Sequence, residues 1–248
     1  MTTELTGFGP IAGDYMGGTG SNLNQQNYGG PSASGNHNGN NHDGVTEQTS
    51  INIASTASYS GAYMSMCVGN LKKHEGFKNV MYKDSEGNIT IGIGHLLATP
   101  EMAAALPFSR TQTYHGHGDE MEREVSVSSG NVISAFNSFK VNSRNVPDMH
   151  ISNDTVIGQC IKDVQSTEVG LRGLYPGYDG FSNSRKTALV DMGFNIGIPK
   201  LTTVFPNFNA AVNRGDWATA AIESHRTGLD DSRNPRNKDT HDQLMSDH

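Results

Sequence analysis

The feature that most constrains the fold is a helix that leads directly into a β-hairpin, within residues 63–94. Apolar side chains recur with the spacing that places them on one face of an α-helix: Met64, Cys67, Val68 and Leu71. Glu75 follows on the next turn, and Gly76 is a residue type that commonly ends a helix. The sequence therefore predicts a helix whose end carries the carboxylate of Glu75.

The segment "VMYKDSEGNITIGIG" predicts the hairpin. Its centre, "DSEGN", is rich in turn-forming residues and separates two strand-like runs. In the second run three isoleucines alternate with Thr90, Gly92 and Gly94. Because successive side chains of a strand point to opposite faces, one face would be packed and the other small and open. Glycine on the open face suggests the close approach of a ligand or of another backbone.

Glu75, Asp84 and Thr90 are the candidate catalytic residues of this unit. A hairpin folded back against the end of the helix could direct all three side chains into one cleft. Two carboxylates and a hydroxyl that holds a water are what hydrolysis of a glycosidic bond requires. The spacing alone leaves open a second interpretation, a solvated hairpin that carries exposed acidic residues.

The rest of the chain predicts mostly helices. "TPEMAAALPF" indicates a short helix, "NVISAFNSFKV" fits either a helix or a strand, and the residues between them are polar. From Ile151 onward the helical pattern returns, with Ser152 as a candidate N-cap and Gly197 as a helix end. "FPNFNAAVNRGDWATAAIES" reads as two short helices broken at "RGD". This order predicts an α+β fold with a minor sheet.

Residues 1–62 differ in composition from everything that follows. They contain 12 Gly and 8 Asn but no Lys or Arg, and the first cation of the chain is Lys72. The segment has few large apolar side chains, so their burial could not offset the conformational entropy that the chain would lose on folding. We therefore predict a disordered tail. The tail is either a flexible linker or a segment that recruits a partner, and its strand-prone "TSINIAS" could add to the edge of a partner's sheet.

Overall composition excludes several classes of protein. A net charge of −7 argues against binding nucleic acid through phosphate neutralisation. No apolar run approaches the roughly 18–20 residues of a membrane span, and the first residues lack the pattern of a secretory signal peptide.

Cys67 and Cys160 are expected to be buried free thiols, with a single bridge as the alternative. The two histidines of "HGHGDE" lack a third ligand, so we expect no metal site.

The segment "EGFKNVMYKDSEGNITIGIGHLL" resembles the active-site segment of the phage-type lysozymes, glycoside hydrolase family 24. Their motif is Glu, eight residues, Asp, five residues, Thr, and this chain matches it without a gap. The resemblance covers residues 63–248 and does not reach residues 1–62. It implies a lysozyme-like fold, in which a long helix joins a small β-hairpin lobe to a larger α-helical lobe. The stretch 98–150 departs from the family as an insertion.

The resemblance implies a role for each matching residue. Glu75 would be the general acid, Asp84 the second carboxylate, and Thr90 the residue that positions the attacking water. The family inverts the anomeric centre, which predicts a carboxylate separation of roughly 6.5–9.5 Å. Leu96 and Phe194 match positions that line the saccharide cleft. No cofactor is implied, because carboxylates alone supply the acid–base chemistry.

Three further residues match supporting positions. The resemblance pairs His95 with Asp163 on the linking helix, as a structural ion pair. Arg233 matches, in a segment with one inserted residue, an arginine that contacts the catalytic glutamate and favours its ionised form.

The implied substrate is peptidoglycan, cleaved between N-acetylmuramic acid and N-acetylglucosamine. The tail of residues 1–62 resembles the translocation segments of colicin-like bacteriocins, which use an outer-membrane receptor and the periplasmic Tol or Ton proteins. We therefore expect a bacteriocin, released from its producer without a signal peptide, acting in the periplasm of a target cell and neutralised in the producer by an immunity protein. A phage endolysin and a secretion-system effector are the alternatives. A non-catalytic peptidoglycan-binding module is the alternative from another class.

Overall fold

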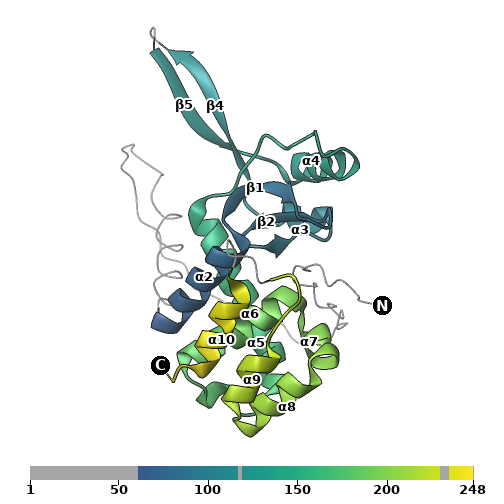
Figure 1. Ribbon diagram of the computed structural model, residues 1–248. Helices are drawn as coiled ribbons and strands as arrows, with labels where there is room; N and C mark the ends of the chain where they lie inside the picture. The colour runs from purple at the N-terminus through teal and green to yellow at the C-terminus, as the bar shows by residue number, and fades with distance from the viewer. Residues whose placement is uncertain (1–60, 117–118, 230–234, 248) are drawn as a thin grey trace, which may run out of the picture. The chain divides into compact units, whose positions relative to one another are not determined.

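The computed structural model describes residues 61–116, 119–229 and 235–247 (Figure 1). The predicted tail, including "TSINIAS", lies outside these residues apart from its last two positions, so the predictions made for it are not tested by the fold. The described elements combine many helices with two small antiparallel sheets, which confirms the predicted α+β class. Within the described residues, no helix is both long enough and apolar enough to cross a membrane.

The predicted helix and hairpin are both present. Helix α2 (Ala62–Glu75) ends at Gly76, whose φ of 80° lies in the region that favours glycine. Strand β1 (Lys78–Lys83) follows at once and pairs antiparallel with β2 (Ile89–Gly92). A short strand, β3 (His95–Leu96), adds to the far side of β2 and completes a three-stranded sheet. Only Gly76 and Phe77 therefore separate the carboxylate of Glu75 from the sheet.

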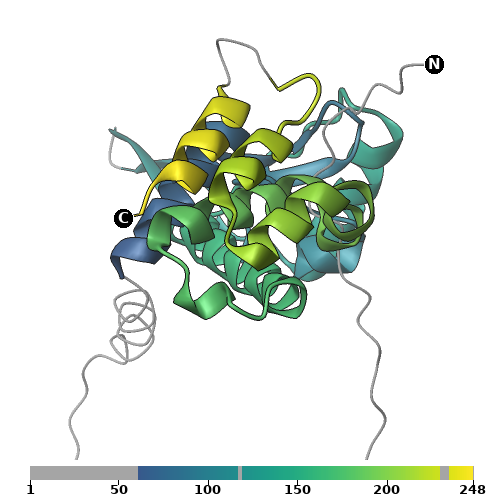
Figure 2. The same cartoon turned by 60° about the horizontal axis from the view of Figure 1, so that its bottom comes forward.

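The long helix α5 (Asn153–Leu174) contacts both the sheet and the helical part of the chain. Its N-cap is Ser152, as predicted, whose side chain accepts a hydrogen bond from the backbone N–H of Thr155. Helix α6 (Asn183–Ile196) is buried over most of its length, because α2 and α5 both pack against it (Figure 2). It ends at Gly197, again as predicted.

Four further helices complete the helical part: α7 (Ile198–Val204), α8 (Pro206–Arg214), α9 (Trp217–Glu223) and α10 (Arg236–Met245). The break at "RGD" is confirmed, since Gly215 ends α8 in the left-handed conformation and the side chain of Asp216 caps α9. Helix α10 packs against α6 and α9, so the end of the described chain returns to the middle of the fold.

The insertion at 98–150 holds two short helices and a ribbon. Helix α3 (Pro100–Ala104) packs on α4 (Ser129–Val141), which settles the ambiguous "NVISAFNSFKV" as helix. Between them, β4 (Ser109–Gly116) and β5 (Asp119–Ser126) form a two-stranded antiparallel ribbon that projects from the rest (Figure 1). The sequence did not predict this ribbon, because its strands lack alternating apolar residues.

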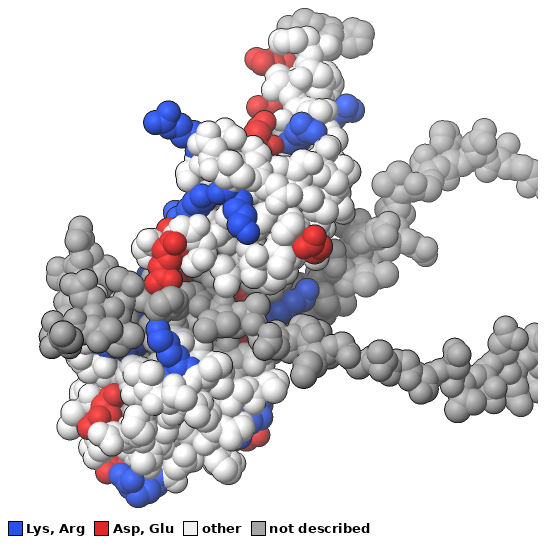
Figure 3. Space-filling model, turned by 90° about the vertical axis from the view of Figure 1, so that its right-hand side faces the viewer, with Lys and Arg blue, Asp and Glu red and all other residues white. Residues whose placement is uncertain are grey.

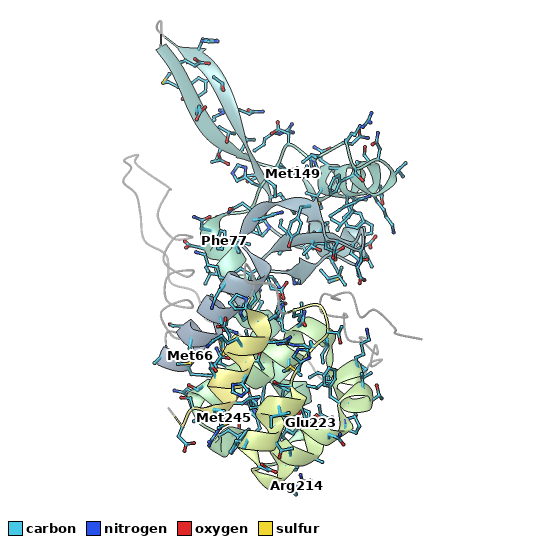
Figure 4. All side chains as sticks on the ribbon, in the orientation of Figure 1. Met66, Phe77, Met149, Arg214, Glu223 and Met245 are labelled. Carbon is cyan, nitrogen blue, oxygen red and sulfur yellow. The ribbon has the colours of Figure 1, made fainter. Side chains whose placement is uncertain are left out.

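The ribbon is attached at its base only. Buried Met149 lies at this base, where Ser109 and His150 form a β-bridge, while side chains along the strands project to both sides (Figure 4). Acidic and basic side chains lie close together on the ribbon (Figure 3).

Away from the ribbon, Cys67 and Cys160 are buried free thiols, so the alternative of a disulfide between them is wrong.

Candidate active site

Glu75 is fixed from two sides and open on another. Its Oε1 lies 2.8 Å from Nη1 of Arg236, and its side chain keeps 21% of its surface exposed. A methyl group placed on Gly94 would lie 3.1 Å from Cγ of Glu75 and 3.1 Å from Cε1 of Phe194. Gly94 also has a φ of 68°, so both its conformation and the close approach of Glu75 require glycine. The hairpin backbone and α10 thus hold the carboxylate between them.

Asp84 begins the hairpin turn and is oriented by that turn. Its Oδ1 accepts hydrogen bonds from the backbone N–H groups of Glu86 and Asn88, at 2.9 and 2.8 Å. Its Oδ2 accepts a third from the side-chain amide of Asn88, at 3.1 Å. These local bonds are those of an Asx-type turn, in which an aspartate satisfies the backbone two residues further on. The turn therefore fixes the direction of the Asp84 carboxylate.

Thr90 lies in the middle of a row of side chains across the sheet. It pairs directly with Tyr82 of β1 on one side and with Leu96 of β3 on the other. Directly opposed residues of antiparallel strands share a face of the sheet. Thr90 is 5% exposed, and its hydroxyl donates to the backbone carbonyl of Asn88 at 3.4 Å. Leu96 is partly exposed, and its predicted place in a saccharide cleft stays a prediction.

Tyr82 lies beside the candidate catalytic residues, and the sequence analysis did not single it out. Burial raises the pKa of Tyr82 to about 12, and the charges of Glu75 and Asp84 add to the rise. The phenol therefore lies within range of both acidic side chains, on the face of the sheet that carries Thr90. The candidate catalytic residues are thus brought to one region of the molecule.

Behind Glu75 lies a buried network centred on Asp191 of α6. The Asp191 side chain is fully buried, and its Oδ2 lies 3.0 Å from Nε of Arg236 and 3.1 Å from Nη1 of Arg226. Its Oδ1 lies 2.8 Å from Nδ1 of His74. Burial by itself would raise the pKa of Asp191, but the two guanidinium groups and His74 outweigh it and hold the pKa well below its usual range. Asp191 therefore stays ionised and orients Arg236 toward Glu75.

His74 extends this network to the surface. Its Nε2 lies 2.8 Å from Oδ2 of Asp239 on α10, which also pairs with Lys73. Burial of Asp239 opposes ionisation, but hydrogen bonds from Lys73 and His74 lower its pKa. The side chains of His74 and Lys73 thus tie the end of α2, immediately before Glu75, to α6 and α10.

The arginine beside the acid is Arg236, which the sequence analysis did not assign to this contact. Arg233, predicted to contact Glu75, lies outside the described residues, so that prediction is not tested. Asp191 and Arg226 were also missed, because the partner of a buried ion pair cannot be read from one sequence alone.

The predicted His95–Asp163 pair agrees with the structure, and the predicted cleft-lining residue Phe194 does not. His95 Nδ1 lies 2.9 Å from Oδ2 of Asp163, so the predicted pair is present and ties β3 to α5. Phe194 is fully buried, which contradicts its predicted place on the surface of the cleft. Phe194 instead packs beside Gly94, next to the side chain of Glu75.

Among the described residues, no group of three or more His, Cys, Asp or Glu side chains could hold a metal ion.

The fold and the site together define an α+β protein whose candidate acid, Glu75, lies at the junction of a helix and a hairpin. No model of a known protein family matches the chain. Two curated proteins of Dictyostelium discoideum do. "Probable T4-type lysozyme 2" is 28% identical over 154 residues, which cover 62% of this chain and 78% of that protein. "Probable T4-type lysozyme 1" is 28% identical over 156 residues, with the same coverage. The resemblance to the phage-type lysozymes is confirmed.

Proposed function

We propose that the protein is a lysozyme that hydrolyses the bond between N-acetylmuramic acid and N-acetylglucosamine in peptidoglycan. The observation that carries the proposal is the placement of Glu75, which Arg236 and the backbone of Gly94 hold at the edge of the sheet that bears Thr90. The similarity to two proteins named as lysozymes supports the same reaction.

In the proposed mechanism Glu75 is the general acid. Arg236 contacts Oε1 of Glu75, so we assign Oε2 to the proton that passes to the leaving glycosidic oxygen. Asp84, oriented by its turn, is the second carboxylate, and Thr90 positions the attacking water. The reaction inverts the anomeric centre, for which we expect the carboxylates of Glu75 and Asp84 to lie roughly 6.5–9.5 Å apart. NMR of the first product would contradict inversion if the configuration were retained.

Replacing Glu75 tests the reaction. Glu75→Gln keeps the shape of the side chain but removes the transferable proton, so clearing of a peptidoglycan suspension should slow by about 10²-fold or more. Glu101→Gln, on the exposed surface of α3, is the matched control and should clear the suspension at the native rate. Equal clearing by the native protein and Glu75→Gln would contradict the proposal. Sedimentation with the walls in the absence of clearing would indicate a binding module instead.

We further propose that the enzyme is a bacteriocin, with residues 1–62 as its translocation segment. The composition of these residues supports the idea, since they lack Lys and Arg and are rich in Gly and Asn. Residues 61–247 contain the whole candidate site, so a chain that starts at residue 63 should clear isolated walls at the native rate and fail to kill intact Gram-negative cells. Killing of intact cells by the shortened chain would contradict the translocation role of residues 1–62, and would remove the need for a receptor or for Tol or Ton proteins.

A further inference from the structure

The face of the sheet that carries Thr90 presents an aromatic residue that the proposed mechanism does not use. Tyr82, Thr90 and Leu96 form one row across β1, β2 and β3, with Thr90 paired to both neighbours. The next row, Ile91 and His95, points to the other face, where His95 meets Asp163 of α5. Helix α5 therefore covers the face opposite the row. Tyr82 is only half-buried, so part of its side chain is accessible to a ligand.

A cation fixes the ring of Tyr82. The Nζ atom of Lys78 lies 4.1 Å from the centroid of this ring, within the range of a cation–π contact. The pairing of β1 with β2 is irregular between Lys78 and Tyr82, so the two side chains meet although four positions separate them. Because Lys78 occupies one side of the ring, it restricts the orientation of the phenol.

We propose that Tyr82 contacts the saccharide in the cleft, and that Lys78 is the residue that positions its ring. This inference rests on the proposed lysozyme function. A phenol suits the place, because sugar hydroxyl and acetamide groups need hydrogen-bond partners and the face of an aromatic ring is an apolar surface on which a sugar can pack. A pKa of about 12 keeps the hydroxyl neutral at any working pH, so it can donate a hydrogen bond without adding a third negative charge beside Glu75 and Asp84.

Tyr82→Phe tests the hydroxyl alone, because the ring and its contact with Lys78 remain. Loss of one hydrogen bond to the saccharide should lower kcat/KM on peptidoglycan by roughly threefold to tenfold, mostly through KM. The melting temperature should stay close to that of the native protein. Tyr114→Phe is the matched control: Tyr114 is a partly exposed tyrosine of the ribbon, whose ring also lies beside a cation, Arg123, at 5.7 Å. This variant should keep native kcat and KM.

A double-mutant cycle tests the role of Lys78. Lys78→Met alone should lower kcat/KM by roughly twofold to fourfold, since a cation–π contact at an exposed site is weak. If Lys78 acts by positioning the ring, the same substitution should have no effect in a Tyr82→Leu background. An equal loss in both backgrounds would overturn the positioning role. Arg123→Met on the ribbon is the control and should leave the kinetics unchanged.

Binding separates failure of this inference from failure of the proposed function. The probe is an oligosaccharide of N-acetylglucosamine, titrated into the full chain and followed by NMR or calorimetry. If the native protein clears peptidoglycan while Tyr82→Phe keeps native kcat, KM and affinity for the probe, the contact is wrong and the lysozyme function stands. If the native protein does not turn over peptidoglycan, the enzymatic function is wrong, and the affinity of Tyr82→Phe for the probe decides the contact.

Discussion

The two hairpins of this chain have the same backbone pattern and opposite surroundings. In the hairpin β1–β2, every residue of β2 is buried, and α5 packs against both strands. In the ribbon β4–β5, eight consecutive residue pairs hold the strands together, yet almost every described side chain is exposed. The first hairpin depends on tertiary packing and the second on its own ladder. The hairpin that carries the candidate chemistry is therefore the one whose position the rest of the molecule determines.

The largest effect should come from the network behind the first hairpin. Asp191→Ala would leave Arg226 and Arg236 buried with their main partner removed, so we expect the free energy of unfolding to fall by about 3–5 kcal/mol. Asp179→Ala, which breaks an exposed pair with Arg172, is the control and should cost less than about 1 kcal/mol. Urea unfolding of both variants measures the difference. Similar losses in the two would mean that the buried network does not stabilise the fold.

A pair of core substitutions compares the two hairpins directly. Ile91→Ala removes a fully buried side chain from β2, and we expect a loss of about 2–5 kcal/mol. Val125→Ala shortens a half-buried side chain of β5 and should cost less than about 1 kcal/mol. Thermal or urea unfolding gives both values. A comparable loss at Val125 would show that the ribbon is packed against the body in solution, which would remove the contrast between the hairpins.

Acid should weaken the buried network that supports the first hairpin. The pKa of Asp191 is lower in the folded chain than the ordinary value of about 3.9, so its stabilisation is present above that value and is lost as the pH falls. We expect Asp191 to account for a loss of about 2–3 kcal/mol between pH 5 and pH 2. Unfolding measured across this range should show a flatter acid limb in Asp191→Asn than in the native protein. An unchanged slope would contradict the coupling.

Shortening the ribbon should have the smallest effect. Arg110 and Val125 are direct partners, so residues 111–124 can be replaced by Asn-Gly, which closes a two-residue hairpin turn. We expect stability to change by less than about 1 kcal/mol and clearing of isolated peptidoglycan to stay at the native rate. A fall in clearing would place the ribbon in the substrate-binding surface. A fall confined to the killing of intact cells would assign it to recognition of a partner.

The first hairpin could be predicted from sequence and the ribbon could not, and the reason is physical. The alternation of Ile89, Ile91 and Ile93 records a buried face, whereas β5 alternates charged residues with a few isolated apolar ones. A ribbon held together by backbone hydrogen bonds does not require particular side chains, so its strands are hard to recognise in the sequence. The helix ends near Glu75 and at Gly197 could also be predicted, because a glycine in the local sequence marks each of them.

Within the candidate site, the local residues could be predicted and the long-range partners could not. Glu75, Asp84 and Thr90 lie within sixteen positions of one another, so their spacing is visible in the sequence. Tyr82 was not singled out, although the pairing is regular from the turn to Tyr82 and counting outward from the turn places it opposite Thr90. The contact between Arg236 and Glu75 was missed because the two residues lie 161 positions apart along the chain.

The distance along the chain between Glu75 and Arg236 has a consequence for the timing of biosynthesis. A ribosome must add 160 residues after Glu75 before it reaches Arg236, the partner of this acid. Nascent chains and prematurely terminated fragments therefore carry an acid that is not yet anchored. Muramidase activity should arise only when translation has passed the last helix, which would spare the cell that makes the protein from its own incomplete copies.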